Sequence, residues 1–214
     1  MKTQTREAQA ALNPESALNL LRQGNQRFQD NLKANRNLLE QVNTTAEGQF
    51  PFATILSCID SRTSAELIFD QGLGDIFSIR IAGNVLNDDI LGSMEFACKL
   101  AGSKLLVVLG HSSCGAIKGA CSGAELGHLT GLLKKIEPSV QAVRAEGDNL
   151  DADELAQRVA DANVDRVVEQ ILEQSAVLRD MIAKKQVGIV GAMYSVHSGA
   201  VTFHDLVSAS RAGA

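Results

Sequence analysis

Beyond residue 50, short apolar runs alternate along the chain with longer segments in which apolar residues recur at helical spacing. The run 104–110 (KLLVVLG) is almost continuously apolar, as strands are when helices cover both faces of a parallel sheet. Strands alternating with helices indicate an α/β fold with crossover helices between parallel strands. A turn at 198–199 leads into residues 200–204, expected as an antiparallel edge strand. The remaining predicted strands are 52–57, 75–81 and 187–196, and the predicted helices are 64–70, 88–100, 129–144 and 151–185, with another beginning at 115–120.

A separate helical segment precedes the first strand. Asn13 is a suitable N-cap and Pro14 takes the first helical position. We therefore expect a helix over 14–33, appended to the sheet, and a polar loop over 34–50. No repeat or linker divides the chain, so we predict one domain, with an N-terminal helical arm at 1–50 and an α/β core at 51–214. The helix carries apolar residues at nearly helical spacing, namely Leu18, Leu21, Phe28 and Leu32.

Composition and charge narrow the kind of partner. Hydrophobic residues make up 45% of the 214 residues and charged ones 21%, which is an ordinary globular balance. A net charge of −5 at pH 7 gives no reason to expect nucleic acid or an anionic membrane as partner. The N-terminus lacks the apolar core of a signal peptide, and no apolar run is long enough to span a membrane. We expect a cytoplasmic protein that acts on a small molecule.

Chemically active side chains follow two of the predicted strands. Cys58, Asp60 and Arg62 come directly after the strand that ends at residue 57, and His111 and Cys114 come directly after the strand that ends at residue 110. In α/β folds, sites lie beyond the carboxyl ends of the strands. If the two strands are neighbours, these five side chains meet in one crevice.

Two thiolates and one imidazole are a ligand set that suits Zn²⁺. Cys58, His111 and Cys114 would leave the fourth tetrahedral position open for water, which is the catalytic rather than the structural arrangement. In a reducing compartment, cysteines are more often ligands, catalysts or buried fillers than disulfides. We expect one zinc ion per chain. The other cysteines, Cys98 and Cys121, are predicted to be buried fillers, and the other histidines, His128, His197 and His204, to be surface or edge residues.

The motifs CIDSR (58–62) and GHSSCGAIKG (110–119) resemble the paired signatures of the β-carbonic anhydrases, C-x-D-x-R and H-x-x-C. The similarity continues through 65–77, 80–84, 92–97 and 129–136. It implies a four-stranded parallel sheet with an added antiparallel strand and zinc-dependent, reversible hydration of CO2 to bicarbonate. It also implies homodimers that often pair into tetramers, with active sites at the dimer interface and N-terminal helices that embrace the partner subunit.

The resemblance also implies a role for each site residue. Zinc-bound hydroxide attacks CO2, Asp60 accepts a hydrogen bond from that hydroxide, and Arg62 holds the Asp60 carboxylate. In some members the aspartate instead becomes a fourth zinc ligand and closes the site. Two thiolates weaken the metal as a Lewis acid, so we expect activity to rise towards mildly alkaline pH. Substrate contacts are implied for Gln49, whose amide matches a bicarbonate donor, and for Phe77, Ala82, Phe96 and Gly115.

Some positions depart from the family pattern. Ile55 stands where the bicarbonate-inhibited branch has a Trp beside a non-catalytic anion site, although Arg80 and Tyr194 match other members of that site. The missing Trp favours the always-open form with water on zinc. Ala82 replaces a bulkier residue, and Thr63-Ser64 replace a commoner Val-Pro, so both changes can reshape the pocket.

Three alternatives to CO2 hydration stay open at this stage. A carbonyl sulfide hydrolase would keep the fold and the metal and would use the larger pocket at Ala82. A thiol hydrolase would use Cys114 as nucleophile, although this leaves Cys58 without a role. A non-catalytic zinc-binding protein would have no use for Asp60 and Arg62.

Overall fold

Within the residues that the computed structural model describes, 3–147 and 149–207, the strands form one mixed sheet in the order β2-β1-β3-β4-β5. The first four run parallel, and β5 pairs antiparallel with β4. This confirms the predicted α/β sheet and its antiparallel edge strand. The strands are β1 (Ala53–Ser57), β2 (Ile76–Arg80), β3 (Leu105–His111), β4 (Gly188–Tyr194) and β5 (Val201–Phe203).

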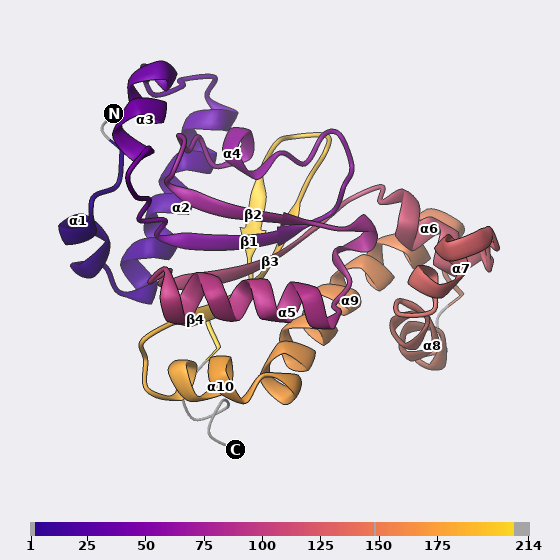
Figure 1. Ribbon diagram of the computed structural model, residues 1–214. Helices are drawn as coiled ribbons and strands as arrows, with labels where there is room; N and C mark the ends of the chain where they lie inside the picture. The colour runs from indigo at the N-terminus through magenta and orange to yellow at the C-terminus, as the bar shows by residue number, and fades with distance from the viewer. Residues whose placement is uncertain (1–2, 148, 208–214) are drawn as a thin grey trace.

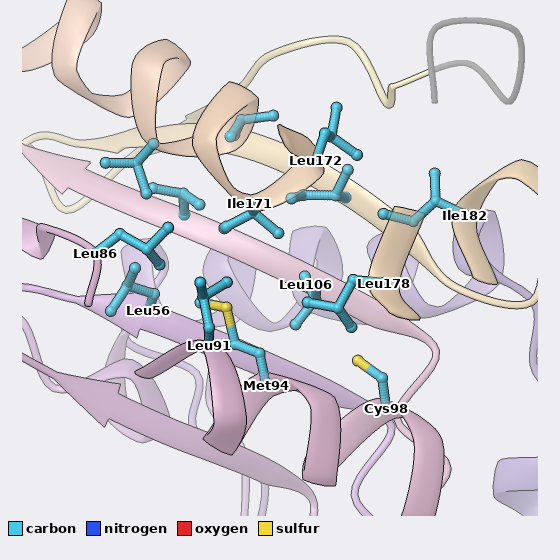
Figure 2. Close-up of a cluster of buried hydrophobic side chains, with 14 of the residues drawn as sticks. Leu56, Leu86, Leu91, Met94, Cys98, Leu106, Ile171, Leu172, Leu178 and Ile182 are labelled. Carbon is cyan, nitrogen blue, oxygen red and sulfur yellow. The ribbon is translucent and has the colours of Figure 1, made fainter. Parts of the chain in front are cut away.

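Helices cover both faces of the sheet (Figure 1). On one face, α5 (Asp88–Glu95), α9 (Ala152–Gln174) and α10 (Ala176–Ala183) bury an aliphatic cluster against the strands. Figure 2 shows this cluster, in which Leu56 and Leu106 from the sheet lie among side chains from all three helices. Side chains of a strand point alternately to the two faces of the sheet. Because helices cover both faces, every residue of β1 and β3 is buried.

The opposite face is covered by α2 (Pro14–Gln29) and α4 (Ala65–Ile68). Their apolar side chains pack with Ile55, Val107 and Val190, which point away from the first cluster. Asn13 caps α2 through its side chain, and Pro14 opens it, as predicted. The helix ends at Gln29, earlier than the expected residue 33, because Asn31 takes a left-handed backbone conformation (φ 54°).

The prediction of a polar loop over 34–50 is wrong in part, because α3 (Leu38–Thr45) forms within it. Its buried residue is Gln41, and its apolar residues Leu38, Leu39 and Val42 are exposed. A helix that buries a glutamine and exposes its leucines has no hydrophobic periodicity of the usual kind. A short helix, α1 (Arg6–Ala10), also precedes α2.

Two predicted long helices are each divided in the structure. The segment 129–144 forms α7 (Gly127–Leu133) and α8 (Glu137–Ala145), because Pro138 lacks the N–H that a continuous helix needs. The segment 151–185 forms α9 and α10, which separate at Ser175. Ser175 has an extended backbone and caps α10 through its hydroxyl, which accepts from Leu178 N.

A third apolar cluster lies beyond the carboxyl ends of the strands. There α6 (Gly115–Ser122), α7, α8 and the first half of α9 form a lobe beside the sheet (Figure 1). The cluster includes Cys58 and Cys114 together with Val85, Ile117 and Ile136. The end of the sheet that carries the predicted metal ligands is therefore packed in apolar surroundings.

Candidate metal centre

The adjacency of β1 and β3 brings the two sequence motifs together. The strands pair in parallel, with Ser57 opposite Leu109. Cys58 therefore leaves the sheet beside His111, the last residue of β3, and Cys114 follows as the N-cap of α6. Ser113 takes a left-handed conformation (φ 56°), which turns the chain sharply enough to place His111 and Cys114 on the same side.

The three predicted ligands form one buried group. The ligand atoms of Cys58, His111 and Cys114 all lie within 4.8 Å of one another. The two Sγ atoms are 4.0 Å apart, which is too long for a disulfide. Two sulfurs bound to one zinc ion at about 2.3 Å and the tetrahedral angle would lie about 3.8 Å apart. The spacing of the thiols therefore fits a shared metal ion.

The imidazole of His111 is oriented for a metal. Its Nδ1 lies 2.9 Å from the carbonyl oxygen of Ser112, so Nδ1–H donates to that oxygen and leaves the lone pair on Nε2. That Nε2 is buried and has no hydrogen-bond partner among the described residues. A buried nitrogen lone pair without a partner costs free energy, and a metal ion would satisfy it.

The pKa values of the two thiols also indicate that a cation is needed to ionise both. A hydrogen bond from Cys114 lowers the pKa of Cys58 to about 4, in spite of burial. The same hydrogen bond to Cys58, together with burial, raises the pKa of Cys114 far above its ordinary value. The protein alone thus favours one thiolate and one thiol, and a divalent cation is needed to hold both as thiolates. Two thiolates, one imidazole and a divalent charge are the composition of a zinc site.

Asp60 and Arg62 form a planar ion pair beside the cluster. Arg62 Nε donates to Asp60 Oδ1 at 2.9 Å, and Nη2 donates to Oδ2 at 2.8 Å. The backbone N–H of Arg62 also donates to Oδ1, at 3.0 Å. These bonds to Arg62 hold the pKa of Asp60 well below its ordinary value, with the nearby His111 adding to the effect. Asp60 is therefore an ionised carboxylate that is held by Arg62, and it is not part of the three-residue metal group.

Arg80 and Thr63 hold the backbone of the loop that carries Cys58 and Asp60. Arg80 Nε donates to the carbonyl oxygen of Cys58 at 3.0 Å, and Nη2 donates to that of Asp60 at 2.6 Å. The Thr63 hydroxyl donates to one of the same two carbonyls, at 3.0 Å from Cys58 O and 2.8 Å from Asp60 O. Sequence reasoning assigned Arg80 to an anion site and gave Thr63 no supporting role.

Gly83 and Asn163 form a second support, which sequence reasoning also missed. The backbone N–H of Gly83 donates to Cys58 Sγ at 3.4 Å, and Asn163 Nδ2 donates to the carbonyl oxygen of Gly83 at 3.0 Å. Gly83 lies in the short helical turn η1 (Ala82–Asn84) with φ 66°. Asn163 is a buried polar residue in the apolar stripe of α9, and this exception to the pattern is the signal that could have identified it.

The predicted substrate residues fall into two groups. Gly115 directly follows Cys114, and Ala82 precedes Gly83, whose N–H donates to Cys58 Sγ. Gln49 is exposed and precedes the amino end of β1, whereas Cys58 follows its carboxyl end. Phe77 pairs with Thr54, near the same amino end. Gln49 and Phe77 of one chain are therefore not brought to that chain's own cluster.

Phe96 also lies away from the cluster. It begins the π-helical turn η2 (Phe96–Leu100) after α5, and 54% of it is exposed. Its ring packs edge-on against Phe77, with centroids 6.4 Å apart. The two rings line an open cavity of about 680 Å³ between β2 and α5. Core packing within one chain thus leaves a large part of Phe96 uncovered.

The remaining positions singled out in the sequence are also placed. Ile55 is fully buried in the core beneath α2 and α4, and Tyr194, at the end of β4, is opposite His111. Burial raises the pKa of Tyr194. Cys98 is buried as predicted, whereas Cys121 is only half-buried.

The fold and the buried Cys-His-Cys group are typical of a metal-dependent α/β enzyme. The sequence pattern of the carbonic anhydrase family matches residues 53–201. Carbonic anhydrase 2 of Mycobacterium tuberculosis is 36% identical over 199 residues, which cover 90% of this chain and 94% of that protein. The chain therefore belongs to the β-carbonic anhydrase family, whose members are zinc enzymes that hydrate CO2.

Solved structures agree with this assignment. The β-carbonic anhydrase CafA of Aspergillus fumigatus superposes with a TM-score of 0.75 at 29% identity, covering 81% of this chain and 85% of that one. A tetrameric β-carbonic anhydrase of Sordaria macrospora has the same fold, with a TM-score of 0.72 at 24% identity and coverage of 79% and 92%. Across the part of the chain that is described, no helix is both long and apolar enough to cross a membrane.

Proposed function

We propose that this chain catalyses the reversible hydration of CO2 to bicarbonate and a proton with one zinc ion held by Cys58, His111 and Cys114. The observation that carries the proposal is the buried Cys-His-Cys group with the Asp60–Arg62 ion pair beside it. When bound, zinc supplies a Lewis acid that lowers the pKa of a water molecule to near neutrality. A structural zinc site would need neither the ion pair nor an open coordination position.

Asp60 orients the nucleophile. Because its pKa is low, the Asp60 carboxylate is ionised and can only accept hydrogen bonds. Oδ1 receives two hydrogen bonds from Arg62, whereas Oδ2 receives one and keeps a lone pair for a further donor. A hydroxide that donates its only hydrogen to Oδ2 must direct a lone pair elsewhere, towards the carbon of CO2. Arg62 fixes the carboxylate in this position and keeps it from the metal.

The pH dependence follows from the same roles. Asp60 stays ionised throughout the neutral range, so the nucleophile is the group that titrates there. We expect activity to rise from pH 6 to 9 and to level off at the alkaline end. A flat profile over that range, measured by stopped flow, would count against a nucleophile made by deprotonation.

We further propose that the working unit is at least a homodimer, with Gln49, Phe77 and Phe96 of one chain completing the pocket of the other. The support is their position: all three lie away from their own chain's cluster, and Phe96 is half-exposed. Among the described residues, β2 is an edge strand of the sheet, and such a strand can pair with another chain. The exposed side chains of Leu67, Leu73 and Leu100 are further apolar surface that a partner chain would cover.

The proposal is tested by paired variants. Asp60→Asn keeps the size of the side chain but removes the acceptor-only charge, so we expect at least a hundredfold loss in kcat with zinc content unchanged. Cys114→Ser should lose both zinc and activity. The matched control is Cys121→Ser, which changes a half-buried cysteine on the same helix and should keep both. Full activity in zinc-free protein would instead support a thiol hydrolase.

The carbonyl sulfide alternative needs a direct comparison. The same purified sample is assayed with CO2 and with carbonyl sulfide. We expect a kcat/KM for CO2 that exceeds the value for carbonyl sulfide. A higher kcat/KM for carbonyl sulfide would support the same metal site but would assign carbonyl sulfide as the substrate.

A further inference from the structure

A small polar cavity is lined by the segment between η1 and α5, by residues near the start of α8 and by one face of α9. Its volume is about 190 Å³, below the range of pockets that bury drug-sized ligands. Of the metal-centre residues described above, it shares only Asn163, and none of the three ligands. Its other lining residues include Asn87, Lys135, Arg166 and Gln170.

Two cations face this cavity without a carboxylate partner. In residues 3–147 and 149–207, neither Lys135 nor Arg166 has a carboxylate oxygen within ion-pair distance. The Nε–H of Arg166 is buried and has no hydrogen-bond acceptor. A guanidinium donor that is buried without an acceptor costs more than a neutral group in the same state. This donor is the feature of the cavity that most needs a ligand.

The surrounding backbone adds to the positive potential. The helix α5 begins at Asp88, and α8 begins between the lining residues Lys135 and Pro138. The amino ends of helices carry partial positive charge. One carboxylate, that of Asp88, also lines the cavity and opposes an anion. Against it stand two full cations and two helix ends, so the balance favours a negative ligand.

We propose that this cavity binds a small oxyanion of the phosphate or sulfate type. Arg166 is partly buried and offers a buried Nε–H, whereas Lys135 is exposed. Gln170 and Gln174 are further lining residues with amide donors. A compact anion with several acceptor oxygens satisfies these donors at once, which a monatomic halide cannot do.

The cavity is linked to the metal centre by two hydrogen bonds. Asn163 lines it and donates to Gly83 O at 3.0 Å, and Gly83 N donates to Cys58 Sγ at 3.4 Å. A bound anion would therefore stiffen the turn that supports Cys58. The proposal itself concerns binding alone and does not depend on the proposed reaction.

The test uses zinc-loaded protein and inorganic phosphate. Thermal unfolding is followed by circular dichroism, because the chain has no Trp and a single Tyr. At constant ionic strength, phosphate and sulfate should raise Tm in a saturable way, and chloride should not. Isothermal titration calorimetry with phosphate should show a dissociation constant at least tenfold weaker in Arg166→Gln.

Two further variants make the result decisive. Lys135→Gln, which changes an exposed lining residue, should weaken phosphate binding by a smaller factor and serves if Arg166→Gln does not fold. Lys184→Gln, whose lysine pairs with Asp180 on the surface, should bind phosphate like the unaltered protein. Phosphate that binds at the metal instead would be unaffected by Arg166→Gln. Equal binding in all variants, or an equal effect of chloride, would overturn the proposal.

Discussion

The three proposed metal ligands depend on neighbours that hold the backbone around them. Arg80 and the Thr63 hydroxyl fix the carbonyl groups of Cys58 and Asp60, and Gly83 donates to the Cys58 sulfur. Residues that support metal ligands in this way commonly change metal affinity or activity by about 10–100-fold when they are replaced. The loop and the turn are therefore as much a part of the site as the ligands.

Arg80→Gln tests the support of the Asp60 loop. The glutamine side chain is shorter than that of arginine and cannot donate to the carbonyl oxygens of both Cys58 and Asp60. We therefore expect kcat/KM to fall about tenfold or more. The fall should lie mainly in kcat, because the orientation of Asp60 matters in the transition state. Stopped-flow CO2 hydration measures both constants.

The matched control for this variant is Arg144→Gln. Arg144 also donates to a backbone carbonyl, that of Cys121 at 2.9 Å, but outside the site. Unchanged kinetics in both variants would mean that Arg80 does not position Asp60.

Gly83→Ala tests the turn beside Cys58. The residue has φ 66°, and an added Cβ would lie 2.8 Å from Ile136 Cδ1 and 3.3 Å from Ala116 Cβ. A left-handed alanine alone costs about 1–2 kcal/mol, and the contact adds to this. We expect a lower free energy of unfolding and weaker zinc retention, measured by denaturation and by dialysis against a chelator. Unaltered zinc retention would show that the turn does not support Cys58.

At the scale of elements, a buried carboxylate ties the N-terminal arm to the core. Asp70, after α4, accepts from Arg27 Nε at 2.6 Å, from Arg36 Nη1 at 2.5 Å and from the Ala34 backbone at 3.1 Å. Burial opposes the charge, but the hydrogen bonds from the two arginines prevail and lower the pKa of Asp70. The arm is thus attached by charge as well as by the apolar face of α2.

Stability should depend on pH through this group. Its pKa is lower in the folded than in the unfolded protein, so the folded state binds fewer protons between the two values. The contribution is complete above about pH 4, the ordinary value of an Asp, and is lost as pH falls through the folded pKa.

Asp70→Asn should remove about 3 kcal/mol at neutral pH, because the nearly buried Arg36 and the partly exposed Arg27 lose their partner. Asparagine tolerates the left-handed conformation of this residue (φ 43°), so the backbone is not the cause. Urea unfolding at pH 7 and pH 3 measures both effects. A variant that loses as much stability at pH 3 as at pH 7 would contradict the account.

The sequence was sufficient for those elements that bury apolar residues regularly. The parallel strands and their alternation with helices were predicted because their apolar runs are buried under helices on both faces of the sheet, and the antiparallel edge was predicted from the turn at 198–199. The helix α3 was missed because it buries Gln41, which accepts a hydrogen bond from Leu73 N. The breaks near Pro138 and at Ser175 depend on local caps, which a hydrophobic pattern does not contain.

At the scale of the whole molecule, the three residues predicted as metal ligands lie together in one chain, whereas three of the predicted substrate residues lie away from them. Cys58, His111 and Cys114 meet because β1 and β3 are neighbours. Gln49, Phe77 and Phe96 lie elsewhere. A motif shows which residues are needed but not whether they come from one chain or two.

Association should therefore control activity. We expect the sedimentation coefficient to correspond to a dimer or tetramer at micromolar concentration. Specific activity should fall on dilution below the dissociation constant of the dimer. Phe96→Ser, which removes a half-exposed ring, should shift the dimer equilibrium towards monomer. A fully active monomer would refute the proposal that the pocket is shared between chains.

CO2 hydration by this chain should depend on a zinc ion held by Cys58, His111 and Cys114. The most direct test is a zinc titration of metal-free protein, with stopped-flow CO2 hydration and bound zinc measured in the same samples. Activity should rise in proportion to bound zinc and stop rising at one zinc per chain. One bound zinc per chain without CO2 hydration would contradict this expectation.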